Sequence, residues 1–313
     1  MSLLKSVLTI DVIVLAVGEE CMANPLDLVK LTSLMKLTSG KPGIKIGLID
    51  GPVVMSHPDL ETKNIRTVSG KIPGECTQKG SDACLHGTFV AGILCGKRGS
   101  VAPAICPNCT LMVRPIFTEL TSVSERMPST TPQELAGAII ECIEAGSHVL
   151  NLSVALAQPS SRGERELEEA LDYAVKRGVI VVAASGNQGT LGSSAITRHP
   201  WVIPVVASDL QGRPISESNL GSSIGRKGLC APGVDVTSLG TEEKPLTLGG
   251  TSVATPFVTG AIALLRSEFP AATAADVKFA ITQAGMRRRN TIVPPLLDAW
   301  MAYQIMTNNL ERR

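Results

Sequence analysis

The sequence predicts an α/β fold of three layers, in which a mostly parallel sheet is covered by helices on both faces. Along the 313 residues, short apolar runs alternate with amphipathic stretches, which is the pattern of parallel strands joined by helices. Hydrophobic residues make up 44% of the chain and aromatic residues only 3%. Ala, Val, Ile and Leu must therefore fill the interior, which suits strands that are buried on both faces.

Several apolar runs have the length and composition of buried strands. They are Ile44–Ile49, Leu111–Phe117, Val149–Val154, Val179–Ala184 and Val202–Ala207. Because helical patterns separate them, ligands are expected at the carboxyl ends of a parallel sheet. Asp50 and the segment around Asn187 follow two of these ends.

Capping signals and glycine stops mark the predicted helices. Thr131-Pro132-Gln133-Glu134 has the form of a capping box with proline at the first helical position. It opens a helix that runs to about Ala145. The other predicted helices cover Glu164–Lys176, Ser252–Phe269 and a segment from the cap Thr273–Asp276 to about Ala284.

Residues 1–40 are predicted to form an N-terminal extension and residues 41–313 a single domain, because nothing marks an interdomain linker. The first 18 residues are apolar, but Asp11 interrupts them and no clean small-residue cleavage site follows. We therefore do not interpret them as a signal peptide. A cytoplasmic location is expected, with secretion as the alternative.

The charge balance argues against nucleic acid and membrane as partners. Lys and Arg number 29 against 28 Asp and Glu, which leaves no basic field to hold a polyanion or an anionic lipid surface. No run of about 18 apolar residues is present, so no membrane-spanning helix is predicted.

The eight cysteines could be disulfides, metal ligands or buried thiols. Two pairs are suggestive, Cys76 with Cys84 and Cys106 with Cys109. A four-thiolate zinc site would need two close pairs, and only the second pair has a two-residue spacer. We expect structural thiols or one or two disulfides, and no metal. Three further cysteines are predicted to be buried in the core, namely Cys95, Cys142 and Cys230.

Three short segments stand out by their residues and their order. They are Ile49-Asp50-Gly51, His86-Gly87-Thr88 and Gly250-Thr251-Ser252-Val253-Ala254-Thr255-Pro256. A serine hydroxyl becomes a nucleophile when an imidazole takes its proton and a carboxylate fixes the tautomer of that imidazole. Asp50, His86 and Ser252 supply one group of each kind, in the chain order Asp, His, Ser that subtilisin has.

These segments and Ala183-Ala184-Ser185-Gly186-Asn187-Gln188-Gly189 resemble the motifs of subtilisin-like serine peptidases, the S8 family, from about Ile44 to Asp298. The resemblance implies a serine endopeptidase with the triad Asp50, His86 and Ser252 and with Asn187 in the oxyanion hole. It also implies that His86 opens a helix, and that Ser252 lies at a helix N-terminus, where free N–H groups favour an oxyanion.

The same resemblance implies that a peptide or protein substrate lies between the strand that leads into Thr118 and the segment Ser153-Val154-Ala155, and pairs with them as an added strand. The implied substrate-binding residues are Ser153, Val154, Ala155, Ala184, Ser185 and Gly186. No cofactor is expected, and Gly96–Ala102 lacks the calcium-ligating stretch usual in the family. The chain is expected to be a monomer. The other histidines, His57, His148 and His199, are interpreted as structural.

A finer resemblance is to cyanobactin-maturation proteases, through Asp50-Gly51-Pro52-Val53, the short spacing to His86 and Val113–Phe117. Macrocyclising members carry an inserted helical segment, for which the 35 residues between Asp50 and His86 leave no obvious room. Hydrolysis is therefore preferred. The alternatives are a peptide macrocyclase or transpeptidase on the same triad and an inactive peptide-binding scaffold. A nucleotide-binding protein is disfavoured because no G-x-G-x-x-G follows the first strand.

Overall fold

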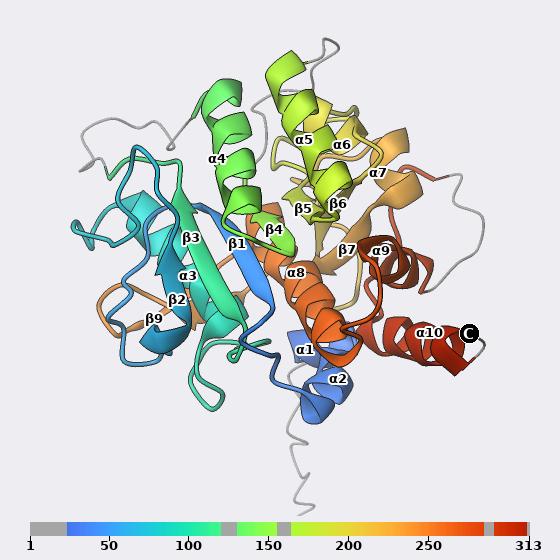
Figure 1. The fold of residues 1–313 in the computed structure, drawn as a ribbon, viewed down its shortest axis with the longest axis horizontal. Coiled ribbons are helices and arrows are strands. Elements are labelled where there is room, and N and C mark those ends of the chain that lie inside the picture. Colours follow the sequence, from blue (N-terminus) through green and yellow to red (C-terminus); the bar gives the residue numbers. More distant parts are fainter. Residues whose placement is uncertain (1–23, 120–129, 155–163, 285–290, 312–313) are drawn as a thin grey trace, which may run out of the picture.

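The computed structural model describes residues 24–119, 130–154, 164–284 and 291–311 (Figure 1). The predicted substrate residue Ala155 lies outside the described residues.

A seven-stranded sheet forms the centre of the molecule, and all of its paired neighbours run parallel. Its strand order is β2-β3-β1-β4-β5-β6-β7. The strands are β1 (Lys45–Asp50), β2 (Ile65–Thr67), β3 (Thr110–Pro115), β4 (Val149–Leu152), β5 (Ile180–Ala184), β6 (Val202–Ser208) and β7 (Leu229–Pro232). A separate antiparallel pair consists of β8 (Val236–Leu239) and β9 (Pro245–Leu248). The predicted parallel α/β fold is confirmed.

Helices cover both faces of this sheet, as Figure 1 shows. On one face lie α4 (Pro132–Glu144) and α5 (Arg165–Arg177), and on the other α3 (Asp82–Cys95) and α8 (Thr251–Glu268). The remaining elements are α1 (Pro25–Leu28), α2 (Leu31–Leu37), η1 (Thr62–Asn64), α6 (Ala195–Arg198), α7 (Ser222–Lys227), α9 (Ala274–Gln283) and α10 (Ala299–Glu311). Among the described residues, none of the helices combines the length and the hydropathy that a membrane span needs.

Successive side chains of the central strands enter two separate cores. Ile46 and Leu48 of β1 belong to the core that packs against α3 and α8, whereas Ile49 belongs to the core under α4 and α5. This alternation follows from the two-residue repeat of a strand. Asp50, two positions after Leu48, is therefore directed to the α3 side, and Ser153 follows Val149 and Asn151 to the α8 side of β4.

Two helix starts differ from their predicted form. Thr131 accepts the N–H of Glu134 at 3.1 Å, as a capping box requires, but the Glu134 carboxylate pairs with Arg114 at 2.8 Å and Lys71 at 2.9 Å instead. The prediction that His86 opens its helix is wrong. The helix α3 begins four positions earlier, because Ser81 caps it by accepting the N–H of Cys84.

Residues before the predicted domain boundary at 41 pack into the main core. Val29, Leu31 and Leu34 have no exposed surface and belong to the same cluster as Ala299 and Met306 near the other end of the chain. The division into an extension and a peptidase domain stays a prediction.

The cysteines form one disulfide among the described residues, between Cys76 and Cys84. The described cysteines without a disulfide are all buried, namely Cys95, Cys106, Cys109, Cys142 and Cys230. Burial raises the pKa of Cys142 and that of Cys230 to about 12. These two thiols therefore stay protonated at neutral pH and are poor nucleophiles.

Candidate active site

Asp50 ends β1 at the place where the order of the strands reverses. From β1 the sheet extends through β3 on one side and through β4 on the other, and such a switch point opens a crevice at the carboxyl edge. Asp50 is fully buried, and its Oδ1 accepts the N–H of Gly51 at 2.7 Å. The carboxylate is thus fixed by its own backbone turn.

Gly51 brings this turn into direct contact with the helix that carries His86. A Cβ atom at Gly51 would lie 2.0 Å from the carbonyl oxygen of Ala83, inside van der Waals contact. Only glycine permits this approach. The distance between the Asp50 turn and α3 is therefore set by two backbones in contact.

His86 lies between the carboxylate and the serine. Its Nδ1 is 2.7 Å from Asp50 Oδ1, and its Nε2 is 2.9 Å from Ser252 Oγ. Since the Asp50 carboxylate can only accept, Nδ1 carries the proton of the neutral ring and Nε2 is free to accept from the serine. The imidazole is 27% exposed, so a substrate can reach it.

The electrostatics of His86 follow from two opposing effects. Burial by itself would lower the pKa of His86, because it disfavours the imidazolium. The negative charge of Asp50 and its hydrogen bond outweigh burial, so the pKa of His86 is raised above its ordinary value of 6.5. The carboxylate therefore makes the ring a stronger base.

Ser252 is the second residue of α8. The N-cap Gly250 has φ +118°, a conformation that favours glycine, and a Cβ there would lie 3.0 Å from Asn187 Nδ2. The N–H groups of Val253 and Ala254 both donate to Gly250 O. Within the described residues the Ser252 N–H has no acceptor, as expected in the first turn of a helix.

Asn187 is held by the residue before the serine. The N–H and the hydroxyl of Thr251 both donate to Asn187 Oδ1, each at 2.9 Å. These two donors fix the orientation of the amide, because its oxygen must face them. The NH₂ of Asn187 is then the group left to donate to a ligand, beside the N–H of Ser252.

The described residues predicted to bind substrate lie at the same edge of the sheet. Ser153 and Val154 follow β4, and β4 pairs with β5 through Leu152 and Ala183. Ala184 ends β5, and Ser185 and Gly186 lead on to Asn187. Their contacts with substrate stay a prediction.

Asn219 organises the loop that carries Asn187, and no sequence pattern had pointed to this residue. Its Oδ1 accepts the N–H groups of Gln188 and Thr190, each at 3.1 Å, and its Nδ2 donates to Ser185 O at 3.1 Å. The buried Asn219 side chain thus provides hydrogen-bond partners to backbone groups that have none from a helix or a strand. Asn219 lies in an irregular polar stretch, where an asparagine has no distinguishing pattern.

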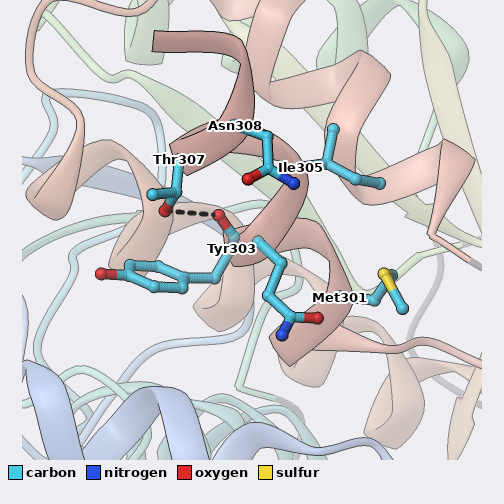
Figure 2. A pocket seen from close by; sticks show the side chains of 6 residues that line it. Met301, Tyr303, Ile305, Thr307 and Asn308 are labelled. Atoms are coloured by element: carbon cyan, nitrogen blue, oxygen red, sulfur yellow. Dashed lines mark hydrogen bonds between the residues drawn. The ribbon is translucent and has the colours of Figure 1, made fainter. Parts of the chain in front are cut away.

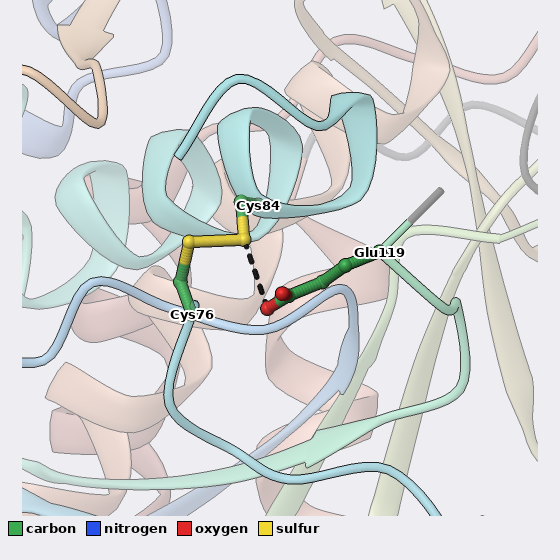
Figure 3. A group of neighbouring side chains, drawn as sticks. All are labelled: Cys76, Cys84 and Glu119. Carbon is green, nitrogen blue, oxygen red and sulfur yellow. Dashed lines mark hydrogen bonds between the residues drawn. A yellow bond between two sulfur atoms is a disulfide. The ribbon is translucent and has the colours of Figure 1, made fainter. Parts of the chain in front are cut away.

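One cluster of the described residues has the composition of a metal site. The ligand atoms of Cys76, Cys84 and Glu119 lie within 4.8 Å of one another (Figure 3). Because the two sulfur atoms are joined in a disulfide, they offer no thiolates to a metal. The cluster does brace the site, since the bond ties the first turn of α3 to Cys76, whose N–H donates to Val53 O.

A hollow of about 340 Å³ lies elsewhere, along α10 (Figure 2). Its lining includes Met301, Tyr303 and Ile305, and none of the candidate catalytic residues contributes to it. The candidate site lies at the carboxyl edge of the sheet instead.

Comparisons with known proteins agree with this geometry. The model of the subtilase family, Peptidase_S8, matches residues 41–294. The alkaline protease of Alkalihalobacillus alcalophilus is 34% identical over 230 residues, which cover 73% of this chain and 55% of that protease. The chain thus spans about half the length of this curated relative.

Solved structures include maturation proteases, as the finer resemblance predicted. A variant of the protease domain of PatA is 28% identical, with a TM-score of 0.79 over 86% of this chain and 97% of that one. The PatG macrocyclase in complex with peptide is 21% identical, with a TM-score of 0.76 over 88% of this chain and 95% of that one, and it shares the fold. The chain belongs to the subtilase family of serine peptidases.

Proposed function

We propose that this chain is a serine endopeptidase that hydrolyses peptide bonds through an acyl-enzyme. The observation that carries the proposal is the continuous contact from Asp50 through His86 to Ser252, at 2.7 Å and 2.9 Å. Both distances are within hydrogen-bond reach, which a general base needs.

The first half of the reaction forms the acyl-enzyme. His86 Nε2 accepts the proton of Ser252 Oγ while that oxygen attacks the carbonyl carbon of the scissile peptide bond. Asp50 holds the Nδ1 proton and stabilises the imidazolium. The imidazolium then gives its proton to the departing amine, and the acyl group stays on Ser252.

The oxyanion of the tetrahedral intermediate needs donors that are already in place. The Ser252 N–H and the Asn187 NH₂ have no acceptor among the described residues and are free to donate to it. The N-terminus of α8 adds the positive end of its dipole. Water, activated by His86, then releases the acyl group.

The acceptor of the acyl group separates hydrolysis from macrocyclisation. Residues 51–81, all of which the structure describes, contain only η1 and β2 as regular elements, so no helix inserted there covers His86. This supports water as the acceptor. The finer proposal is that the substrate is a specific precursor peptide, and its support is the similarity to the protease domain of PatA.

Incubation with a library of linear peptides, followed by mass analysis, tests the proposal. Two linear fragments per cleaved peptide are expected, and none with Ser252→Ala. A cyclic product, lighter than the linear one by a water, would assign transpeptidation instead. If the folded wild-type protein cleaves no peptide and reacts with no fluorophosphonate, the peptidase proposal is wrong, and the remaining hypothesis is an inactive peptide-binding scaffold.

The Cys76–Cys84 disulfide bears on the location of the protein. Disulfides persist in oxidising compartments and are rare in the cytosol. We propose secretion, the alternative named from the sequence, rather than a cytoplasmic location. Alkylation of the protein in its native host, followed by intact mass, would overturn this if both thiols were free.

A further inference from the structure

The carbonyl oxygen of Ser252 lacks its partner in the helix. In an α-helix each carbonyl accepts the N–H of the residue four positions later. Four positions after Ser252 stands Pro256, which has no N–H and whose ring crowds that same carbonyl. The helix therefore does not fix the peptide unit of the nucleophile by its usual bond.

Ser153 supplies the missing donor from the neighbouring strand. Its Oγ donates to Ser252 O at 3.2 Å, and the residue is 7% exposed. A hydroxyl has a single proton, so this donation requires that Ser153 Oγ accept from its other neighbour. Asn151 meets the requirement, because its Nδ2 donates to Ser153 Oγ at 2.7 Å.

Asn151 is oriented from α8 in turn. Thr259 Oγ1 donates to Asn151 Oδ1 at 2.8 Å, so the amide must present its NH₂ to Ser153. Asn151 and Thr259 have no exposed surface. Three directed hydrogen bonds thus run from α8 to β4 and back to the carbonyl of Ser252.

We propose that Ser153 is a positioning residue for the nucleophile, with Asn151 and Thr259 holding it. By fixing the Ser252 peptide unit, it keeps Ser252 Oγ within reach of His86 Nε2. The inference rests on the proposed function and gives the Ser153 hydroxyl a role other than substrate contact. Its removal would leave the part-buried carbonyl of Ser252 and a buried N–H of Asn151 without these partners, which proteins avoid.

The rate of labelling by an alkyl fluorophosphonate reports on the nucleophile without a peptide substrate. Ser153→Ala is expected to lower the second-order rate constant about tenfold. The matched control is Ser147→Ala, which removes another buried serine hydroxyl, one that has no hydrogen-bond partner among the described residues. Its rate constant should equal that of the wild type.

Pro256→Ala makes the test specific, because it returns a helical N–H to the Ser252 carbonyl. In that background Ser153→Ala should slow labelling by less than about threefold, since the carbonyl again has a donor. An equal loss in both backgrounds would overturn the role of the carbonyl. Circular dichroism establishes that each variant is folded.

Other outcomes separate this inference from the proposed function. No labelling of folded wild-type protein would refute the function itself. Wild-type labelling with an unchanged rate for Ser153→Ala would refute the positioning role alone. If Ser153→Ala does not fold, Thr259→Val tests the same chain of bonds from its far end, and an unchanged rate in that folded variant also overturns it.

Discussion

Removal of the Cys76–Cys84 disulfide should lower the thermal stability by an amount that the closed loop determines. The two cysteines are separated by 8 positions. For such a loop the chain-entropy relation gives about 8 cal/mol/K, or about 2.5 kcal/mol of unfolding free energy at 25 °C. A chain of 313 residues has an unfolding entropy of about 0.66 kcal/mol/K, so the expected decrease in Tm is about 4 °C.

Scanning calorimetry of the Cys76→Ser, Cys84→Ser double variant beside the wild type measures this decrease. A phosphine reductant should shift the wild type toward the variant and leave the variant unchanged, because the other described cysteines form no disulfide. A variant Tm within about 1 °C of the wild type would refute the argument that this bond restricts the unfolded chain.

Three further predictions concern the site. As the pH falls, kcat/KM should be half lost above pH 6.5, because the pKa of His86 is raised and the protonated ring no longer acts as a base. A pH profile with this midpoint at or below 6.5 would contradict the prediction. Asn187→Ala should lower kcat by about 10²- to 10³-fold with little change in KM, as removal of one oxyanion donor does in subtilisin, and steady-state kinetics on a cleaved peptide decides it. Gly51→Ala should abolish folding or activity, because the new Cβ would lie 2.0 Å from Ala83 O. A Cβ at Gly43 would have no heavy atom within 4 Å, so Gly43→Ala should match the wild type in yield and Tm. Equal behaviour of the two glycine variants would show that the Asp50 turn can move.

The strands that the sequence predicted well are those with long apolar runs. Ile44–Ile49 and Val202–Ala207 each lie within one residue of the bounds of β1 and β6. β2 was missed because it is three residues long and partly exposed, which is too short for a period to show. β7 was missed because it is four residues long and follows the polar Arg226-Lys227-Gly228, so no long apolar run marks it.

The candidate site also contains residues that the sequence predicted and residues that it did not. Residue types and chain order pointed to the three residues that meet at hydrogen-bond distance, since that chemistry leaves few alternatives. The supporting residues Asn151 and Asn219 were not predicted. Each acts through one buried amide whose partners are distant in the chain, such as Thr259 or Ser185, and no spacing rule relates such positions.

The helices before residue 41 bear on how the chain is synthesised. Val29 O accepts the N–H of Ala299 at 3.0 Å, and α2 packs against both α8 and α10. A ribosome makes α2 early and α10 late, so Leu31 and Leu34 find their full set of neighbours only when nearly all of the described chain has emerged. An expression product that begins at residue 41, where the family match starts, would lose these side chains and expose the apolar residues of α8 and α10 against which α2 packs.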